Sequence, residues 1–407
     1  MPYTVGIDYG TNSVRAVVVD VKGGRIVGQS VFAYPSGTDG VVTDPKNPLL
    51  ARQNPADYLL GLEKSVCGAL AAAAADRSFR TEKVIGIGVD TTGSTPLPVD
   101  EHCVPLSFRP EFRRNPNAMA WLWKDHTAAD EAIEITELAR KIRPRYLAKI
   151  GGVYSSEWFF SKLLHLARTD PGVFRAASSF LECADYIPAV LTGVSSPSAV
   201  LRSVCAAGHK AMYSTEWGGL PDEEFLAEID PAFRGLRARL YDRAYPAGTP
   251  AGGLCQPWAK RLGLNAGIPV SVGAFDGHIG AVGAGIVPGA LVKIMGTSSC
   301  DMMIFPVEEN LPDIPGVCGI VPDSIVPGYY GVEAGQSAVG DLFYWFVKTF
   351  MRTPGEDPYH RYGVAAAALA PGESGLLALD WHNGNRTVLV DQKLTGLLVG
   401  MTLGTRS

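Results

Sequence analysis

The sequence lacks three features that would point to particular classes of protein. Its seven cysteines are scattered and contain no C-x-x-C pair, so we read them as reduced thiols rather than a zinc site or redox centre. No basic block occurs and the net charge is -5 at pH 7, which argues against binding to nucleic acid or anionic membranes. The most apolar stretch, residues 66–75, is too short to cross a bilayer, and no signal-peptide pattern follows Met1. We therefore expect a cytoplasmic protein with a small, neutral or anionic ligand.

The first part of the chain predicts a sheet covered by helices. Apolar runs indicate three strands at residues 3–8, 14–20 and 25–33, separated by glycine-containing turns. Helical spacing follows over residues 55–75, with Asn54 as a possible N-cap. A fourth strand, residues 84–90, is apolar on both faces, which is typical of a central strand in a helix-covered sheet. Residues 118–250 are mostly helical in pattern.

A second, similar pattern begins near residue 290. Strands are predicted at residues 290–295, 300–305 and 328–333, followed by an amphipathic helix at 338–351 that should cover the new sheet and a last strand at 394–403. This repetition predicts two related α/β domains, residues 1–284 and 285–407, with a ligand cleft between them. Because the last strand is followed by no covering helix, we expect the second domain to be incomplete.

The turn after the first strand has the composition of a phosphate site. Gly10 permits a tight turn, and the amides and hydroxyls that follow, with Arg15, can contact phosphate oxygens; the turn residues are Gly10, Thr11, Asn12 and Ser13. Asp8 would repel phosphate unless Mg²⁺ lies between them. The alternative is a polar hairpin turn whose aspartate bonds its own backbone.

A matching turn, Gly296, Thr297 and Ser298, separates the first two strands of the second half. Either turn alone is weak evidence, since hairpins commonly use glycine and hydroxyl residues. The two together predict a nucleoside triphosphate held between the domains. Neither turn is a P-loop, so the grip on phosphate differs from that of P-loop enzymes.

Asp276 is a lone carboxylate between the apolar run 268–274 and a glycine-rich segment. An acid at the end of a buried strand is a common position for a general base in α/β enzymes. The alternative is a helix N-cap, because an apolar small-residue helix follows. The residues themselves leave both readings open.

Seven segments resemble, in order, the motifs of the FGGY carbohydrate kinases, and within that family the L-ribulokinases most closely. They are residues 8–15, 88–94, 122–126, 207–212, 273–278, 296–299 and 331–336, and the resemblance extends over residues 3–403. It implies an α/β fold of the ribonuclease-H-like, actin-like ATPase type, duplicated into two domains that close on sugar and ATP. It also implies ATP-dependent phosphorylation of L-ribulose at O5 in L-arabinose catabolism, with a related pentulose kinase as the alternative.

The resemblance further implies roles for individual residues. Asp276 is similar to the general base that accepts the proton of the attacking hydroxyl, and Asp8 to the residue near Mg²⁺ and the phosphates. The implied sugar contacts are Gly93, Trp123, Lys210, Asp276 and Glu333. From the residues alone, Lys210 could be a surface lysine, Glu333 could pair with an arginine, and Trp123 could be a packing residue. His126 and His278 lack metal-ligand spacing and are read as structural.

The sequence also departs from the family pattern. Members of the family continue beyond the segment matched here with a glycine-rich motif that holds adenosine, and we find no substitute for it in this sequence. We therefore expect the 407-residue form to be weakly active or inactive unless a separate chain supplies that part. A non-catalytic, sugar-binding remnant is the alternative from another class. A homo-oligomer is compatible with the sequence.

Overall fold

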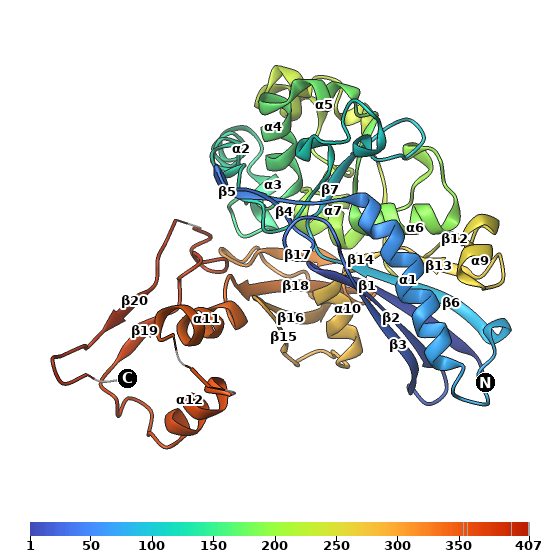
Figure 1. Cartoon of the computed structure of the whole chain (residues 1–407). Coiled ribbons are helices and arrows are strands. Elements are labelled where there is room, and N and C mark those ends of the chain that lie inside the picture. Colours follow the sequence, from blue (N-terminus) through green and yellow to red (C-terminus); the bar gives the residue numbers. More distant parts are fainter. Residues whose placement is uncertain (353, 356, 392, 406–407) are drawn as a thin grey trace.

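The structure, a computed structural model, describes residues 1–352, 354–355, 357–391 and 393–405 (Figure 1). Its largest sheet has the strand order β12-β13-β6-β1-β2-β3, with β14 also pairing with β6. These strands are β1 (Tyr3–Tyr9), β2 (Ser13–Asp20), β3 (Ile26–Ala33), β6 (Val84–Thr91), β12 (Pro250–Gly253), β13 (Pro269–Ser271) and β14 (Ala274–Phe275). The first three are antiparallel, whereas β6 runs parallel to β1 and to β13, which is the strand pattern expected of a ribonuclease-H-like domain.

The predicted elements of the first part are confirmed to within a few residues. Side chains of β1 alternate between buried and half-buried positions, as a strand in a covered sheet requires. Helix α1 (Pro55–Ala73) packs on β2 and β3, and the Asn54 side chain caps it by accepting a hydrogen bond from the Ala56 amide at 3.1 Å. Strand β6 has partners on both sides and is therefore central, as its two apolar faces predict.

Outside α1, β6 and β12, the segment 42–262 forms a largely helical layer, most of it above this sheet (Figure 1). Its helices are α2 (Ala129–Ile142), α3 (Arg145–Ala148), α4 (Phe159–Thr169), α5 (Pro171–Ala176), α6 (Cys183–Thr192), α7 (Val204–Lys210), α8 (Glu223–Ile229) and α9 (Gln256–Leu262). Its short strands are β4 (Val42–Asp44), β5 (Asn47–Gln53), β7 (Pro96–Val99), β8 (Ala120–Trp121), β9 (Ser179–Glu182), β10 (Arg202–Ser203) and β11 (Ala244–Tyr245). Two large apolar clusters form the core of this part of the chain.

A second sheet, in the order β15-β16-β18-β17, follows helix α10 (Asp276–Gly283). Its antiparallel strands are β15 (Val292–Met295), β16 (Ser299–Pro306), β17 (Gly319–Pro322) and β18 (Tyr329–Gln336). The sequence predicts three of these four strands, β15, β16 and β18, but not β17. β17 packs on α7, where a Cβ at Gly319 would overlap the His209 ring, so only glycine permits this approach. The proposed domain division after residue 284 falls between α10 and β15.

The predictions for the last part of the chain need two corrections. The helix expected at 338–351 is divided into α11 (Gly340–Tyr344) and a π-helix (Trp345–Phe350), and Phe343 and Phe350 are 63% and 55% exposed. It therefore does not cover the sheet with a continuous apolar face. The strand expected at 394–403 is reduced to β20 (Leu397–Val399), which pairs with β19 (Leu377–Leu379) away from the main sheets. Helix α12 (Pro358–Ala367) lies between the π-helix and β19 in the chain.

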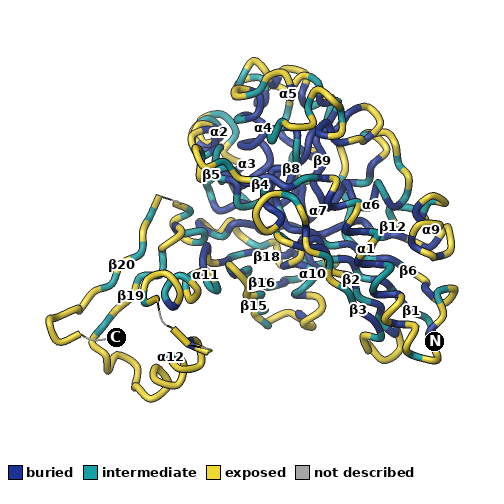
Figure 2. Tube along the Cα trace, in the orientation of Figure 1, coloured by how far each residue is buried: buried dark blue, intermediate teal, exposed yellow. Residues whose placement is uncertain are grey.

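Burial differs sharply along the chain. Figure 2 shows buried chain through both sheets and the helical layer, and mostly exposed chain around α12, β19 and β20. Among the described residues, the structure contains no helix with the length and hydropathy needed to cross a bilayer.

Candidate active site

A cavity of about 410 Å³ lies between the first part of the chain and the second sheet. It brings together segments that are far apart in the sequence. The predicted residues that line it are Asp8, Gly10, Thr11, Asn12, Arg15, Gly93, Trp123, Lys210, Asp276, Gly296, Thr297, Ser298 and Glu333. Ser13 lies outside this lining, buried at the start of β2, where its carbonyl accepts a hydrogen bond from the Gly10 amide at 2.9 Å.

Both predicted turns are held by their own backbone and face the cavity. In the second turn, the Gly296 amide donates to the Ser298 carbonyl at 2.9 Å, and Val339 donates to the Thr297 carbonyl at 2.9 Å. In the first turn, the Trp123 indole N–H donates to the Thr11 hydroxyl at 3.1 Å. Trp123 therefore connects the first turn to the opposite wall of the cavity. The Thr11 hydroxyl keeps its own proton free to donate to a ligand.

Asp8, at the end of β1, pairs with Arg15 on the facing strand β2. The Arg15 Nη1 atom lies 2.7 Å from Asp8 Oδ2, so the cation expected to contact phosphate is bound to the carboxylate expected near the metal. The other oxygen, Asp8 Oδ1, is buried and has no hydrogen-bond partner among the described residues. A buried carboxylate oxygen without a donor is costly, and a cation or a water bound to one would satisfy it.

Asp90 is a further acidic residue near the site that the sequence analysis did not single out. It lies one residue before the end of the parallel strand β6, opposite Asp8 in the register of β1 and β6, and it is not part of the cavity lining. Burial, together with the nearby Asp8 and Asp276 carboxylates, raises its pKa well above the usual value. Its position in the segment 88–94, directly after an apolar strand, was an available signal.

Asp276 begins helix α10 directly after β14. Phe275 occupies the N-cap position, so Asp276 is the first helical residue, and its Oδ1 accepts a hydrogen bond from the adjacent Gly277 amide at 2.7 Å. The side chain is exposed to the cavity but enclosed by protein on its other sides. This removal from bulk water raises the pKa of Asp276 to about 6; the Gly277 amide opposes the shift, and Asp8 and Glu333 add to it.

The carboxylates at this end of the cavity fit a divalent cation. Asp8 helps to raise the pKa of both Asp90 and Asp276, and Asp276 helps to raise that of Asp90, so the three carboxylates lie close together. Asp8 Oδ1 has no hydrogen-bond partner among the described residues. Carboxylate oxygens are the ligands that Mg²⁺ prefers, and a bound cation would relieve the repulsion among them. Asp8 and Asp90 are the residues best placed to hold it directly or through water.

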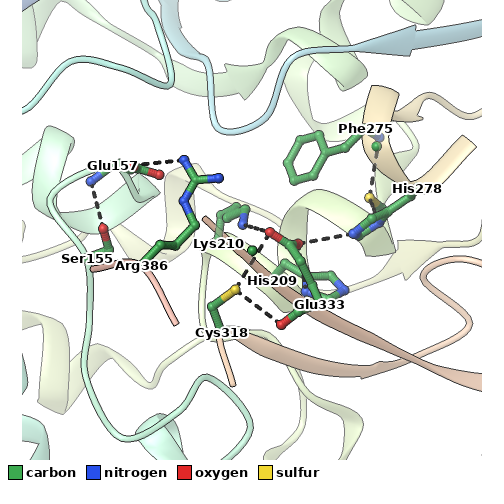
Figure 3. Close-up of polar contacts among 12 residues, drawn as sticks. Ser155, Glu157, His209, Lys210, Phe275, His278, Cys318, Glu333 and Arg386 are labelled. Atoms are coloured by element: carbon green, nitrogen blue, oxygen red, sulfur yellow. Dashed lines mark hydrogen bonds and ion pairs between the residues drawn. The ribbon is translucent and has the colours of Figure 1, made fainter. Parts of the chain in front are cut away.

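Lys210 and Glu333 form a buried ion pair in the lining of the same cavity (Figure 3). Lys210 Nζ lies 3.0 Å from Glu333 Oε1, and His278 Nε2 lies 3.1 Å from Glu333 Oε2. Burial disfavours the Lys210 charge, but Glu333 outweighs it and raises the pKa of Lys210. Lys210 is only 7% exposed, so its reading as a surface lysine is wrong.

His209, His278 and Glu333 also offer ligand atoms that lie within 4.8 Å of one another. We do not regard them as a metal site, because the Lys210 ammonium already neutralises Glu333 and would repel a second cation. His278 Nε2–H donates to the ionised Glu333 carboxylate, and its Nδ1 contacts the Cys205 thiol, so His278 supports Glu333 from behind. His126 contacts the Ser156 hydroxyl at 3.3 Å, again as a structural residue.

Two further polar residues of the lining were not predicted. Glu157 precedes α4, and Arg386 lies between β19 and β20; the Arg386 Nη2 and Glu157 Oε1 atoms are 3.4 Å apart. Neither residue belongs to a recognisable motif, and 229 residues separate them. Gly93 also lines the cavity, and a Cβ there would lie 2.5 Å from the Phe275 ring, so a side chain at this position would not fit without displacing that ring.

The chain is similar in sequence to known sugar kinases. Residues 3–283 match the N-terminal domain of the FGGY family of carbohydrate kinases, and residues 291–406 match its C-terminal domain. A ribulokinase from Shouchella clausii is 43% identical, with 100% of this chain and 72% of the relative covered. A ribulokinase from Vibrio parahaemolyticus is 39% identical, with 100% and 74% covered. The chain thus spans about three quarters of the length of these relatives.

Solved structures share the fold at lower identity. A xylulose kinase from Rhodospirillum rubrum superposes with a TM-score of 0.76 at 21% identity, over 99% of this chain and 74% of that one. Plasmodium falciparum glycerol kinase with ADP gives a TM-score of 0.72 at 15% identity, over 100% and 74%. These likenesses support the two-domain, actin-like fold.

Proposed function

The chain belongs to the FGGY family of carbohydrate kinases, and we propose that it transfers the γ-phosphoryl group of ATP to O5 of L-ribulose, a step of L-arabinose catabolism. The similarity to ribulokinases over the whole chain supports the substrate. The observation that carries the proposal is the placement of Asp276 in one cavity with both glycine-hydroxyl turns and the Lys210–Glu333 pair.

Asp276 is the general base of the proposed reaction. Its carboxylate accepts the proton of the sugar hydroxyl as that oxygen attacks the γ-phosphorus. The bond between the γ-phosphorus and the bridging oxygen breaks, and ADP leaves with that oxygen and the electron pair. A base contributes typically 10²- to 10⁴-fold when it lies within hydrogen-bond reach of the attacking hydroxyl. A raised pKa suits this role, because it brings the basicity of the carboxylate closer to neutral pH.

The two turns bind the phosphates from opposite sides. The Gly10–Arg15 turn and the Gly296–Ser298 turn supply backbone amides, hydroxyls and one guanidinium to the transferred group. Magnesium, when bound near Asp8 and Asp90, neutralises charge on the phosphates. Arg15 keeps Asp8 in place and has further N–H groups for phosphate oxygens.

The sugar occupies the end of the cavity near Lys210 and Glu333. This ion pair offers a donor and an acceptor to sugar hydroxyls, and Trp123 borders the same space. Gly93 borders the same space, where a side chain would displace the Phe275 ring that also lines the cavity.

The decisive test is Asp276→Asn with L-ribulose and MgATP, in a form of the protein whose wild type phosphorylates L-ribulose. We expect kcat to fall by about 10³-fold because an amide cannot accept the proton, while calorimetric binding of L-ribulose stays within a few-fold of the wild type. Asp242→Asn is the matched control, since this aspartate pairs with Arg237 at the surface. Retained turnover in Asp276→Asn would remove Asp276 from the mechanism.

A panel of L-ribulose, D-ribulose, D-xylulose and ribitol tests the choice of sugar. Preferred phosphorylation of L-ribulose supports the proposal. Preference for another pentulose would change the proposed substrate but not the proposed reaction. Sugar binding by the wild type without any phosphoryl transfer would indicate a sugar-binding protein instead.

A further inference from the structure

Arg386 reaches the cavity from a loop that is anchored to the second sheet. The amides and carbonyls of Asn385 and Asp391 exchange hydrogen bonds of 2.8 and 2.9 Å, which close the loop. The Gly335 amide of β18 donates to the Thr387 hydroxyl at 2.8 Å. The backbone beside Arg386 is thereby fixed to the strand that also carries Glu333.

The Arg386 side chain is mostly buried and faces Glu157 from the first part of the chain. Side-chain exposures are 13% for Arg386 and 12% for Glu157. Figure 3 shows the guanidinium between Glu157 and the Lys210–Glu333 pair. Burial alone would raise the pKa of Glu157, but Arg386, followed by His126 and Lys210, holds it below the usual value. Glu157 is therefore an ionised acceptor.

The guanidinium has donors that the protein does not use. Arg386 Nη2 points to Glu157 at 3.4 Å, and Cζ lies 5.7 Å from the Trp123 ring centroid. The Nε–H group is buried and finds no hydrogen-bond partner in the part of the chain that the structure describes. Arg386 also lines the cavity, so the N–H groups of its guanidinium that Glu157 does not use are available to a ligand oxygen there.

Two ion pairs join the two sides of the cleft, and they run in opposite directions: the first part of the chain supplies the cation of one pair and the anion of the other. The first part of the chain supplies Lys210 and Glu157, and the second supplies Glu333 and Arg386. Within these two pairs, each side presents one cation and one anion, so this part of the lining has no excess charge of either sign. Such a surface matches a neutral molecule with several neighbouring hydroxyls, each of which both donates and accepts, better than it matches an anion.

We propose that Arg386 and Glu157 are further sugar-binding residues, and that together they close the cleft over a polyhydroxylated, uncharged sugar. Arg386 donates to one hydroxyl oxygen and Glu157 accepts from a hydroxyl, while their mutual ion pair joins the two sides of the cleft. This inference rests on the proposed sugar kinase function. It adds two residues, from outside the family motifs, to the determinants of sugar affinity.

The test is calorimetric titration of L-ribulose, without nucleotide, into the wild type, Arg386→Ala, Arg386→Lys and Glu157→Gln. Loss of a hydrogen bond to a charged group should weaken the Kd for sugar about 10- to 100-fold in Arg386→Ala. Arg386→Lys keeps the charge but not the planar fork of donors, so most of the loss should remain. Glu157→Gln should give a smaller loss, because an amide oxygen still accepts.

Arg25→Ala is the matched control, because Arg25 forms an exposed pair with Asp76 far from the cavity in sequence and fold. Its sugar affinity should equal that of the wild type. Thermal unfolding of each variant identifies loss of folding; if Arg386→Ala unfolds, Arg386→Lys and Glu157→Gln carry the test. Steady-state kinetics should show a raised KM for L-ribulose with the KM for ATP nearly unchanged.

Three outcomes overturn the inference. Unchanged sugar affinity in the Arg386 and Glu157 variants excludes them as sugar contacts. A raised KM for ATP with unaltered sugar binding places Arg386 on the phosphates instead. If the wild type binds none of the pentuloses and pentitols of the panel, both this inference and the proposed function fail, whereas loss confined to the variants supports both.

Discussion

At the scale of single residues, Asp276 is a carboxylate of the cavity lining that has no ion-pair partner among the described residues. Asp8 pairs with Arg15, Glu333 with Lys210, and Glu157 with Arg386, whereas Asp276 accepts only an amide hydrogen bond. An enclosed carboxylate near other carboxylates binds a proton more readily than one in water. The empty enzyme therefore holds its proposed base partly protonated in mildly acidic solution.

This predicts the pH dependence of the reaction. Burial raises the pKa of Asp276 to about 6, and only the ionised form accepts a proton. The kcat/KM for L-ribulose, which reports the free enzyme, should be level above that pH and fall about tenfold per pH unit below it. The measurement is a kcat/KM profile from pH 5 to 8 with MgATP kept well below its KM, so that the profile reports the enzyme without nucleotide. A level profile down to pH 5 would contradict the raised pKa or the role of the base.

Sequence reasoning found those site residues that stand beside strand ends and in recognisable segments. Asp8 and Asp276 follow apolar runs, and Lys210 lies in a segment shared with the FGGY kinases. Glu157 and Arg386 could not be found this way, because their pairing depends on how two distant loops meet across the cleft. The roles of the site residues remain predictions that the proposed variants test.

At the scale of elements, helix α4 supports the wall of the cavity through Lys162. Its buried ammonium donates to the carbonyls of Ser94 and Leu122 at 2.8 and 2.9 Å. These carbonyls lie beside Gly93 and Trp123, two predicted sugar contacts. Glu182 accepts from the Ser94 hydroxyl at 2.8 Å and completes the support. Burial lowers the pKa of Lys162 and raises that of Glu182, so this scaffold is formed at an energetic cost.

Lys162→Met should therefore destabilise the fold and loosen the sugar site. It leaves buried carbonyls without a donor and Glu182 without its cation, and we expect the free energy of unfolding to fall by about 3 kcal/mol. Urea unfolding measures this, and calorimetry should show weaker L-ribulose binding in the folded variant. The exposed Lys64→Met on α1 is the control and should change stability by less than about 0.5 kcal/mol. Equal stability of the two variants would contradict the support proposed for Lys162.

Elements were predictable where the local pattern and the tertiary environment agree. The alternating residues of β1 and the capped α1 have a sheet to pack against, and both are found. Residues 394–403 have the apolar composition of a strand, but β20 finds only the short β19 as a partner. Apolar composition cannot by itself specify where a strand pairs.

At the scale of the whole molecule, the two parts differ in how much core they contain. The first part holds two extensive apolar clusters, while the cluster at α10, β16 and the β17–β18 connection has five buried members: Ala281, Ile286, Met302, Ile304 and Ile325. Beyond β18, Leu377 and Leu397 are 70% and 54% exposed. The second part therefore depends on its contacts across the cleft more than on its own interior.

This difference predicts where proteases act and how sugar changes their action. Lys393 is exposed next to the β19–β20 pair, so trypsin should cleave there well before residues 1–283. Because Arg386 and Glu333 hold this part to the sugar site, L-ribulose should slow the cleavage. At about 100 times its Kd, sugar stabilises the bound form by about 2.7 kcal/mol, which allows up to about 100-fold protection. Mass spectrometry of timed digests gives both the site and the rate of cleavage.

The Arg386→Ala variant is the control for this prediction. Sugar at the concentration used for the wild type should protect this variant much less. Equal cleavage rates with and without sugar in the wild type would show that the sugar site does not restrain this part of the chain.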